Sequence, residues 1–364
     1  MLQTRLGSLH AFEQTRLSQS AQRWLGGQPP SADTIGRVMS SVDSDEIRAV
    51  LSHVFRKLKR NKGFSPMSAG HVALVIDGHE SHTSYLRCCD GCLEREIETR
   101  SGTRTQYYHR HVAAHLVGRD FTYMVDIEPQ RDSDGEITAA LALYERVHRT
   151  YSRSYDIVMG DALYSCQSIW KAVLANGKQI ITVLKDNCKT LLDEATKLME
   201  HQAPVIRKKK STSQEIREVS DGTSWWDDKI KICVVSCRDT TTVKRQLTGE
   251  IEEVVGKKWF WASSLSTVDI DVFRFVDIAR KRWTIENEGF NTLVTNWYAD
   301  HVYCHEDKAF ENFSLLTILA ANIFQIFYSR NLNEARRKRT TVRHVLNLIT
   351  AGIDAEAIVA SDTS

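Results

Sequence analysis

The sequence predicts an α/β protein: a mixed β-sheet with flanking helices, an N-terminal helical segment and a β-rich insertion. Three observations support this fold class. Short apolar runs rich in β-branched residues, such as the one from Val72 to Ile76, alternate with stretches of helical period. Helix-capping signals dominate residues 1–66. From residue 187 to residue 265 the alternation breaks, and several strand-like runs follow one another.

Residues 1–66 are predicted to form the N-terminal helical segment. The stretch beginning at Ser31 caps a helix that ends near Ser41, and Asp43 starts another that runs to Leu58. Two short helices joined by a tight turn are compatible with helix-turn-helix DNA binding, although plain helical packing is the better explanation. The basic cluster of residues 56–62 can contact phosphate without reading bases, and its cations also suit the end of a helix.

The next part of the chain, residues 67–186, carries the main sheet. Three strands followed by helix, strand, helix and strand is the order of a ribonuclease H-like fold, in which the first and fourth strands are adjacent. Residues 187–265 form the predicted insertion, residues 266–350 the second part of the domain, and residues 351–364 a flexible tail. The predicted strands are 72–76, 105–117, 121–127, 157–159 and 179–183, with a helix over 139–151.

The insertion interleaves basic residues with tryptophans. Such a surface is compatible with clamping and stacking on DNA ends. The alternative, which we favour, is that the tryptophans form a small core for the insertion itself. The four residues are Trp225, Trp226, Trp259 and Trp261.

Three carboxylates are candidates for one shared site. Asp77 follows the first strand and Asp161 the fourth, so adjacent strands would bring them together although they lie 84 residues apart. Glu286 belongs to the apolar stripe of a helix predicted from Asp271 to Leu293. A carboxylate directed at a core is costly unless it is neutralised, and a divalent cation shared with two aspartates would neutralise it. Taken singly, each aspartate is more often a turn former or helix cap, and Glu286 can simply pair with Arg282.

The stretch from Arg280 to Asn291, RKRWTIENEGFN, resembles the C-terminal signature of bacterial insertion-sequence transposases of the DDE type, in the IS-four-like group. In that family an Arg-Trp-x-x-Glu helix supplies the last acidic residue. The segments 75–78 and 160–164 resemble the first and second acidic motifs, and the resemblance keeps the same order from about residue 30 to about residue 330. The fuller signature has a tyrosine and a lysine where this chain has Ala279 and Leu293, so only its arginine and glutamate carry over.

The resemblance implies a ribonuclease H-like transposase that cuts DNA at the ends of a transposable element and joins the freed 3′-hydroxyl to target DNA. Asp77, Asp161 and Glu286 would hold two magnesium or manganese ions. Arg282 would neutralise a phosphate near the scissile bond or hold Glu286 in place. The implied partners are double-stranded DNA and a second copy of the chain, in a synaptic homodimer. Two alternatives are a ribonuclease H-like nuclease without strand transfer and a catalytically inert DNA-binding remnant.

A second group of residues has the spacing of a structural zinc site. Cys89 and Cys92 form a Cys-x-x-Cys pair with a glycine between them, and His109 and His111 alternate on one face of the second predicted strand. A hairpin of about sixteen residues would bring the two pairs together. A thiol pair without metal is equally compatible with the sequence.

Composition agrees with an intracellular enzyme but does not identify its reaction. The 364 residues are 42% hydrophobic, which is enough for a sizeable core, and the net charge of +2 leaves any attraction to DNA to local patches. No apolar run approaches ~18 residues, and the N-terminus lacks the apolar centre of a signal peptide, so we expect a cytoplasmic protein with no membrane partner. In that compartment the eight cysteines favour free thiols or metal ligands.

Overall fold

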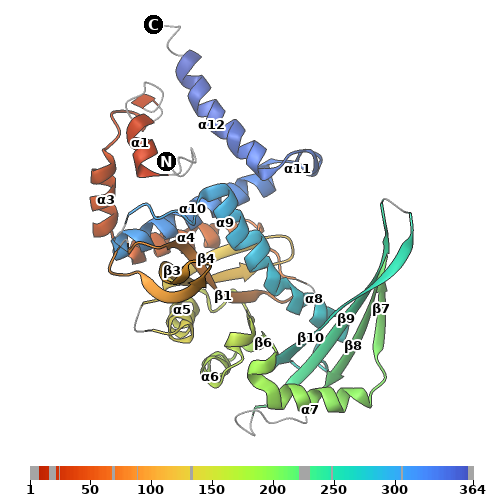
Figure 1. The fold of residues 1–364 in the computed structure, drawn as a ribbon. Helices are drawn as coiled ribbons and strands as arrows, with labels where there is room; N and C mark the ends of the chain where they lie inside the picture. The colour runs from red at the N-terminus through yellow and green to blue at the C-terminus, as the bar shows by residue number, and fades with distance from the viewer. Residues whose placement is uncertain are drawn as a thin grey trace.

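The computed structural model describes residues 8–359 except for 16–21, 24, 68–69, 88, 132–133, 221–229, 247–248 and 305. Its described strands form one mixed sheet of ten, in the order β2-β3-β1-β5-β6-β10-β9-β8-β7, with β4 also paired to β3 (Figure 1). The strands are β1 Ala73–Ser84, β2 Leu93–Thr99, β3 Gly102–Val117, β4 Thr122–Pro129, β5 Ile157–Gly160, β6 Gln179–Val183, β7 Val205–Lys209, β8 Thr212–Val219, β9 Cys233–Lys244 and β10 Ile251–Ser263.

The central five strands have the ribonuclease H-like arrangement that the sequence predicts. β4, β3 and β1 are antiparallel neighbours, β5 runs parallel to β1, and β6 runs parallel to β5. The predicted fold class is therefore confirmed, as is the adjacency of the first and fourth predicted strands. β2 was not predicted; it forms a hairpin with the N-terminal half of β3.

The insertion extends this sheet instead of forming a separate one. β10 pairs antiparallel with β6, so β7 to β10 continue the sheet into an arm that projects from the body beside α7, Lys189–Glu200 (Figure 1). Trp261 is buried at the base of the arm, and Trp259 packs edge to face on Trp283 at 4.8 Å between ring centroids. Trp261 therefore belongs to the main core, and Trp259 is half-buried against that core rather than in a separate core of the insertion. Trp225 and Trp226 lie outside the described residues.

Helices cover both faces of the sheet. One face packs against α8, Val272–Arg280, α9, Asn291–Trp297, and α10, Asp307–Asn331; the other packs against α5, Glu136–Tyr151, and α6, Gln167–Ala175. Strand alternation separates the two cores, since Ala73 and Val75 face the first and Leu74 and Ile76 face the second. The remaining described helices are α1 Leu9–Thr15, α3 Ala32–Ser41, α4 Ser44–Arg60, α11 Glu334–Arg339 and α12 Val342–Val359.

The two predicted N-terminal helices are present with the predicted caps. The hydroxyl of Ser31 accepts a hydrogen bond from the Thr34 amide at the start of α3, and Asp43 caps α4 in the same way. Leu51 and Phe55 of α4 are buried against the sheet, so this helix packs as part of the main body. Lys59, in the basic cluster at the end of α4, donates to the carbonyl of Arg153. The domain boundary at residue 66 and the DNA-binding role of this segment stay predictions.

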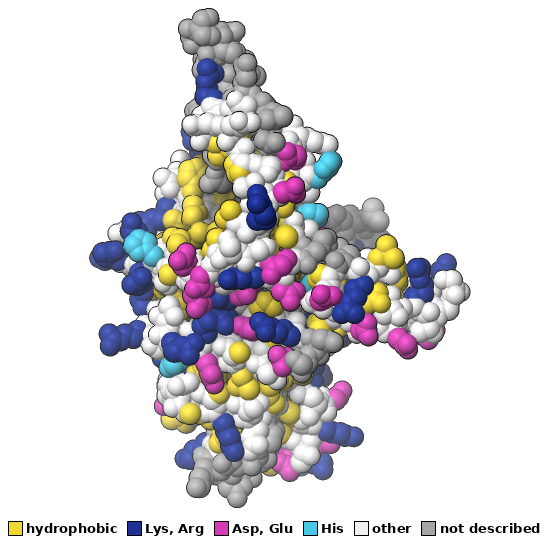
Figure 2. Space-filling view, turned by 90° about the vertical axis from the view of Figure 1, so that its left-hand side faces the viewer, with side chains coloured by type: hydrophobic (Ala, Val, Ile, Leu, Met, Phe, Trp, Pro, Cys, Tyr) yellow, Lys and Arg dark blue, Asp and Glu magenta, His cyan; other side chains and the backbone are white. Residues whose placement is uncertain are grey.

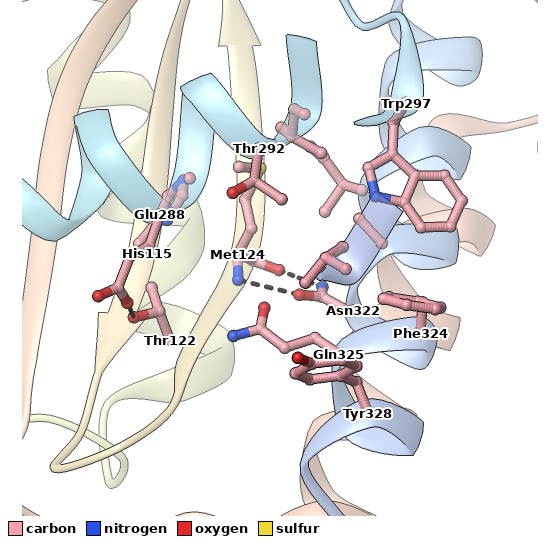
Figure 3. A pocket seen from close by; sticks show the side chains of 15 residues that line it. His115, Thr122, Met124, Glu288, Thr292, Trp297, Asn322, Phe324, Gln325 and Tyr328 are labelled. Carbon is pink, nitrogen blue, oxygen red and sulfur yellow. Dashed lines mark hydrogen bonds between the residues drawn. The ribbon is translucent and has the colours of Figure 1, made fainter. Parts of the chain in front are cut away.

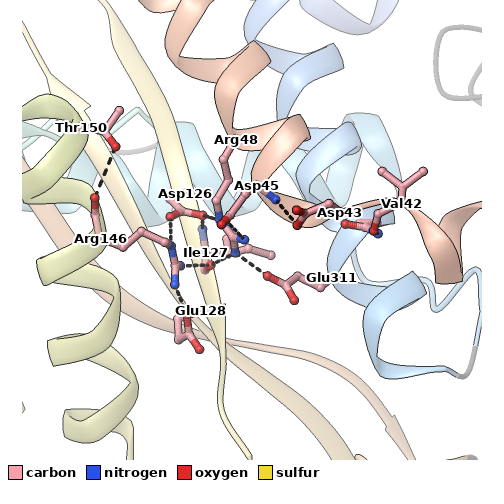
Figure 4. A network of polar contacts seen from close by, with 11 residues as sticks. Val42, Asp43, Asp45, Arg48, Asp126, Ile127, Glu128, Arg146, Thr150 and Glu311 are labelled. Atoms are coloured by element: carbon pink, nitrogen blue, oxygen red, sulfur yellow. Dashed lines mark hydrogen bonds and ion pairs between the residues drawn. The ribbon is translucent and has the colours of Figure 1, made fainter.

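A buried ion network ties α4 to the sheet and to two other helices (Figure 4). The carboxylate of Asp126, 3% exposed on β4, accepts hydrogen bonds from Nε of Arg48 at 2.8 Å and from Nε of Arg146 at 2.6 Å. Arg48 also pairs with Glu311 of α10, and Arg146 of α5 donates to the carbonyl of Ile127. One carboxylate thus fixes α4, α5 and β4 in a common geometry.

The helix α10 runs across the sheet and is the central packing element of its face. Among the described residues it is the single helix long and apolar enough to cross a membrane by length and composition. Here it packs against α3, α4 and β4. The Asn322 amide exchanges two hydrogen bonds with the backbone of Met124, and so fixes α10 to β4 (Figure 3).

The C-terminal region departs from the predicted flexible tail. α12 is helical through Val359 and thereby takes in residues 351–359 of that tail. Its alanines and glutamate are good helix formers, which explains how the helix continues past the predicted boundary.

Candidate active site

Asp77 lies in the middle of β1 and not at its end. The prediction that the first strand ends at residue 76 and that Asp77 follows it was wrong, because β3 continues as a partner beyond this point and pairs Asp77 with Ala113. On the other side of β1 the neighbouring strand stops: β5 pairs with β1 only as far as Val75 and Met159. Asp77 therefore stands just where the sheet opens on one side.

Asp161 lies beside Asp77 on the same face. Asp77 lies two residues after Val75, and Asp161 lies two residues after Met159. Val75 and Met159 are the last residues that pair between β1 and β5, and both pack into the core beneath α8 to α10. Side chains two residues apart on a strand share a face, so both carboxylates point toward these helices. One oxygen of Asp161 also accepts a hydrogen bond from the Leu163 amide at 2.8 Å and caps a 3-10 turn.

Glu286 comes from the helical segment opposite. The predicted helix over residues 271–293 is present but irregular: α8 is followed by a 3-10 turn, Lys281–Trp283, and a π-helix, Ile285–Phe290, before α9 begins. Ile285 and Phe290 hold this segment in the core, while Glu286 keeps a side chain that is 51% exposed. π-helical turns are rare and occur frequently at functional sites.

Arg282 joins the acids from the two sides of the site. Its Nη1 atom donates to Oδ2 of Asp77 at 3.0 Å, and its Nη2 atom donates to Oε1 of Glu286 at 2.9 Å. The guanidinium is buried, with 9% of its side chain exposed. One group therefore contacts both carboxylates, which brings residues 77 and 286 into one site and holds Glu286 in place.

Burial and neighbouring charge set the ionisation of Asp77. Its burial raises the pKa most strongly, the Arg282 guanidinium opposes that shift, and the carboxylates of Asp161, Glu286 and Glu136 raise it further, to about 7. Arg282 thus offsets only part of the negative charge that Asp161, Glu286 and Glu136 place around Asp77. A cation would relieve this excess of negative charge, and carboxylate oxygens are the donors that magnesium and manganese prefer.

The acids fit such a cation by chemistry, although Arg282 now takes part of the space between them. A group able to hold a metal ion needs at least three histidine, cysteine or acidic side chains whose ligand atoms all lie close together. Within the described part of the chain, one group has all its ligand atoms within 4.8 Å of one another, and it consists of Cys89, Cys92 and His109. The three acids are more widely spaced than that.

Glu136 is a site residue that the sequence analysis missed. It opens α5, accepts a hydrogen bond from the Tyr164 hydroxyl at 2.9 Å and pairs with Arg110. A Cβ atom on Gly78 would lie 2.6 Å from its Oε1 atom, so Glu136 packs directly on the backbone next to Asp77. A glutamate in the first turn of a helix is ordinary, which is why its sequence gives no signal.

The two departures from the family signature are core residues. Ala279 and Leu293 are buried, at 1% and 8% exposed, among the apolar side chains beneath α10. Neither position presents a side chain to the acids or to solvent. The contacts that a tyrosine and a lysine would make at these positions therefore have no equivalent here.

Three histidines line the same face near Glu286. The ring of His79 stacks on Phe290 at 4.4 Å, and His111 lies 5.4 Å from His79 between ring centroids. Burial lowers the pKa of His111 and of His115 to about 3, so both are neutral. His115 also lies against Gly289, beside a cavity of about 220 Å³ between the π-helix and α10 (Figure 3).

The predicted zinc ligands are only partly brought together. Cys89, Cys92 and His109 form the cluster described above, whereas His111 faces His79 and Phe290. Residues two apart on a strand are separated by about 6.6 Å, so the cysteine pair beside His109 does not also reach His111.

A comparison with models of protein families shows to which family this chain belongs. The model described as the transposase DDE domain matches residues 42–323, a span that holds Asp77, Asp161 and Glu286. The chain belongs to the DDE transposase family. A search of curated proteins found no match. The matched span begins near the start of α4 and ends within α10, so it includes the arm of β7 to β10 as part of this transposase.

Proposed function

We propose that this transposase is encoded by an insertion sequence, cleaves DNA at the element's ends and transfers the freed 3′-hydroxyl into target DNA. The observation that supports this proposal is that Arg282 contacts both Asp77 and Glu286 where β5 stops pairing with β1, with the charge of Asp161 acting on Asp77. Glu286 is exposed enough to face a bound substrate.

The three acids would hold two magnesium or manganese ions. Bound there, such ions supply Lewis-acid chemistry, which activates water or a DNA 3′-hydroxyl and stabilises the leaving oxygen. Asp77 has to give up its proton first, since its pKa of about 7 leaves it partly protonated at neutral pH. No side chain of the protein is needed as a nucleophile.

Arg282 has two successive roles in this proposal. In the free protein it is the counter-ion of Asp77 and Glu286 and keeps their carboxylates from repelling each other. With cations held by the three acids, its guanidinium would be free to neutralise a phosphate near the scissile bond. Arginine suits both roles because its planar fork can bind two oxygens at once.

The partners follow from the reaction. The substrate is double-stranded DNA, both element ends and target, and pairing of two ends requires at least two copies of the chain, most simply a homodimer. On the face shown in Figure 2, Lys and Arg side chains alternate with Asp and Glu, so DNA contact there would rest on local groups of cations. Such a reaction takes place in the cytoplasm, where bacterial DNA lies.

The deciding experiment uses a supercoiled plasmid, labelled fragments of the element's ends and magnesium. The proposal expects nicked or cut ends and then joined products, all abolished by Glu286→Gln with DNA affinity and thermal stability retained. Glu288→Gln, an exposed acid of the same π-helix, is the matched control and should stay active. Cut ends without joined products would indicate a nuclease, and DNA binding without any cleavage would indicate an inert remnant.

A further inference from the structure

A cluster of two cysteines and one histidine lies at the far end of the β2-β3 hairpin, away from the acids. Cys89 and Cys92 flank a tight turn in which the Cys92 amide donates to the Cys89 carbonyl, and β2 begins at the next residue. Leu93 pairs with Tyr108 across the hairpin, so Cys92 and His109 occupy neighbouring positions on the two strands. Cys92 and His109 are buried, at 3% and 6% exposed.

The three ligand atoms have the spacing of a tetrahedral zinc site. The two sulfurs are 3.5 Å apart, and Nε2 of His109 lies 3.2 Å from the sulfur of Cys89 and 3.6 Å from that of Cys92. Zinc bonds of about 2.3 Å to sulfur and about 2.0 Å to nitrogen give a sulfur–sulfur edge of about 3.8 Å and a sulfur–nitrogen edge of about 3.5 Å in the tetrahedron. A disulfide would need sulfurs about 2.05 Å apart.

The fourth side of the cluster faces the N-terminus of α10. A Cβ atom on Gly91 would lie 2.1 Å from Oδ1 of Asp307, the first residue of α10, so this carboxylate rests on the turn between the two cysteines. One turn further along α10, Phe310 stacks on the His109 ring at 4.7 Å. A neighbouring cavity of about 710 Å³, lined by Gly91, His109 and Asp307 among others, gives an ion a path from solvent.

We propose that Cys89, Cys92 and His109 bind one structural zinc ion, and that Asp307, whose carboxylate rests on Gly91 outside the 4.8 Å cluster, turns toward the ion as its fourth ligand and so fastens the β2-β3 hairpin to the start of α10. Thiolate and imidazole donors select zinc over magnesium, so this site is chemically distinct from that of the acids. Its effect reaches the active site through the sheet. Ala113, the partner of Asp77, lies four residues along β3 from His109, or about 13 Å.

The test measures metal and not activity, so its outcome is independent of the proposed transposition reaction. The full chain is purified without chelator and without a metal-affinity tag, and its zinc is measured by mass spectrometry. One zinc per chain is expected in the wild type, and none in Cys92→Ser or His109→Ala. The matched control is Cys166→Ser, which changes a half-buried cysteine at the start of α6 and should keep one zinc per chain.

A second measurement keeps the proposal testable if those variants do not fold. Cobalt replaces zinc in the wild-type chain, and thiolate-to-cobalt charge-transfer bands with tetrahedral ligand-field bands are expected. Asp307→Asn should weaken zinc affinity at least about tenfold. The zinc site would be overturned if the wild-type protein showed neither zinc nor these bands, or if protein purified anaerobically contained a Cys89–Cys92 disulfide. The assignment of Asp307 as the fourth ligand would be overturned if Asp307→Asn bound zinc with wild-type affinity.

Discussion

Replacing Asp77 with asparagine should stabilise the metal-free protein, and more so as the pH rises. The folded state raises the Asp77 pKa from 3.8 to about 7, chiefly by burial and against the opposing effect of Arg282. A raised pKa means that the native state holds the proton more tightly than the unfolded chain, so stability is lost as the pH rises from about 4 to about 7. Asparagine resembles the protonated form and avoids this loss.

The size of the effect follows from the shift. About three pKa units at 1.36 kcal/mol each amount to about 4 kcal/mol, of which roughly 3 kcal/mol accumulates between pH 5 and pH 8.5. For a chain of 364 residues, an unfolding entropy of about 2.1 cal/mol/K per residue converts 3 kcal/mol into about 4 °C of Tm. The advantage of Asp77→Asn over wild type should grow by about that much across this pH range.

The assay is thermal unfolding with EDTA present, at pH 5, 7 and 8.5, for wild type, Asp77→Asn and the control Glu288→Gln. The control should show no such trend. Added magnesium should stabilise the wild type and leave Asp77→Asn unchanged, which narrows the gap between them. A gap that is constant from pH 5 to pH 8.5, or one that shrinks with pH, would refute the electrostatic reasoning.

Three further predictions concern the scaffold around the acids. Gly289→Ala places a Cβ atom 2.3 Å from the His115 ring, so it should lower the free energy of unfolding by about 1–3 kcal/mol and should slow DNA cleavage by shifting Glu286. The control Gly27→Ala has open space around its Cβ atom and should change neither quantity. Asp126→Asn leaves Arg48 and Arg146 without their shared carboxylate, so it should lower the free energy of unfolding, measured with denaturant, by about 3–5 kcal/mol. The control Asp45→Asn changes the exposed partner of Arg48 and should lower it by less than about 1 kcal/mol. His115→Gln removes a buried imidazole whose pKa of about 3 lies below its value in the unfolded chain. Between pH 7 and pH 5 the free energy of unfolding of the wild type should therefore fall by about 2 kcal/mol more than that of this variant. Equal losses in the two proteins would contradict the burial argument.

Local signals in the sequence were sufficient for the two aspartates and the caps. Asp77 and Asp161 follow apolar runs of strand type, and the order of strands and helices alone places those runs side by side. Ser31 and Asp43 cap their helices because a short polar side chain before an apolar periodic run satisfies the first free amides. The pairing of Arg282 with Glu286 also follows from their spacing of four residues.

Features that depend on long-range contacts were not predictable in this way. β1 continues past Asp77 only because β3 supplies a partner, and the arm joins the main sheet only because β10 meets β6. The π-helix at Glu286 depends on packing around Phe290 and Gly289 that no period in the sequence encodes. Glu136 and Asp307 look like ordinary first-turn acids until the chain folds.

The most direct test of the shared site is affinity cleavage of the polypeptide by bound iron. Fe²⁺ takes the place of magnesium, and ascorbate with peroxide then generates radicals that cut the backbone next to the ion. The account predicts cuts close to residues 77, 161 and 286 in the same preparation, suppressed by excess magnesium and lost together in Asp77→Asn. Cuts near only one of these segments, or cuts near all three that persist in Asp77→Asn, would contradict the claim that the three carboxylates form one cation site.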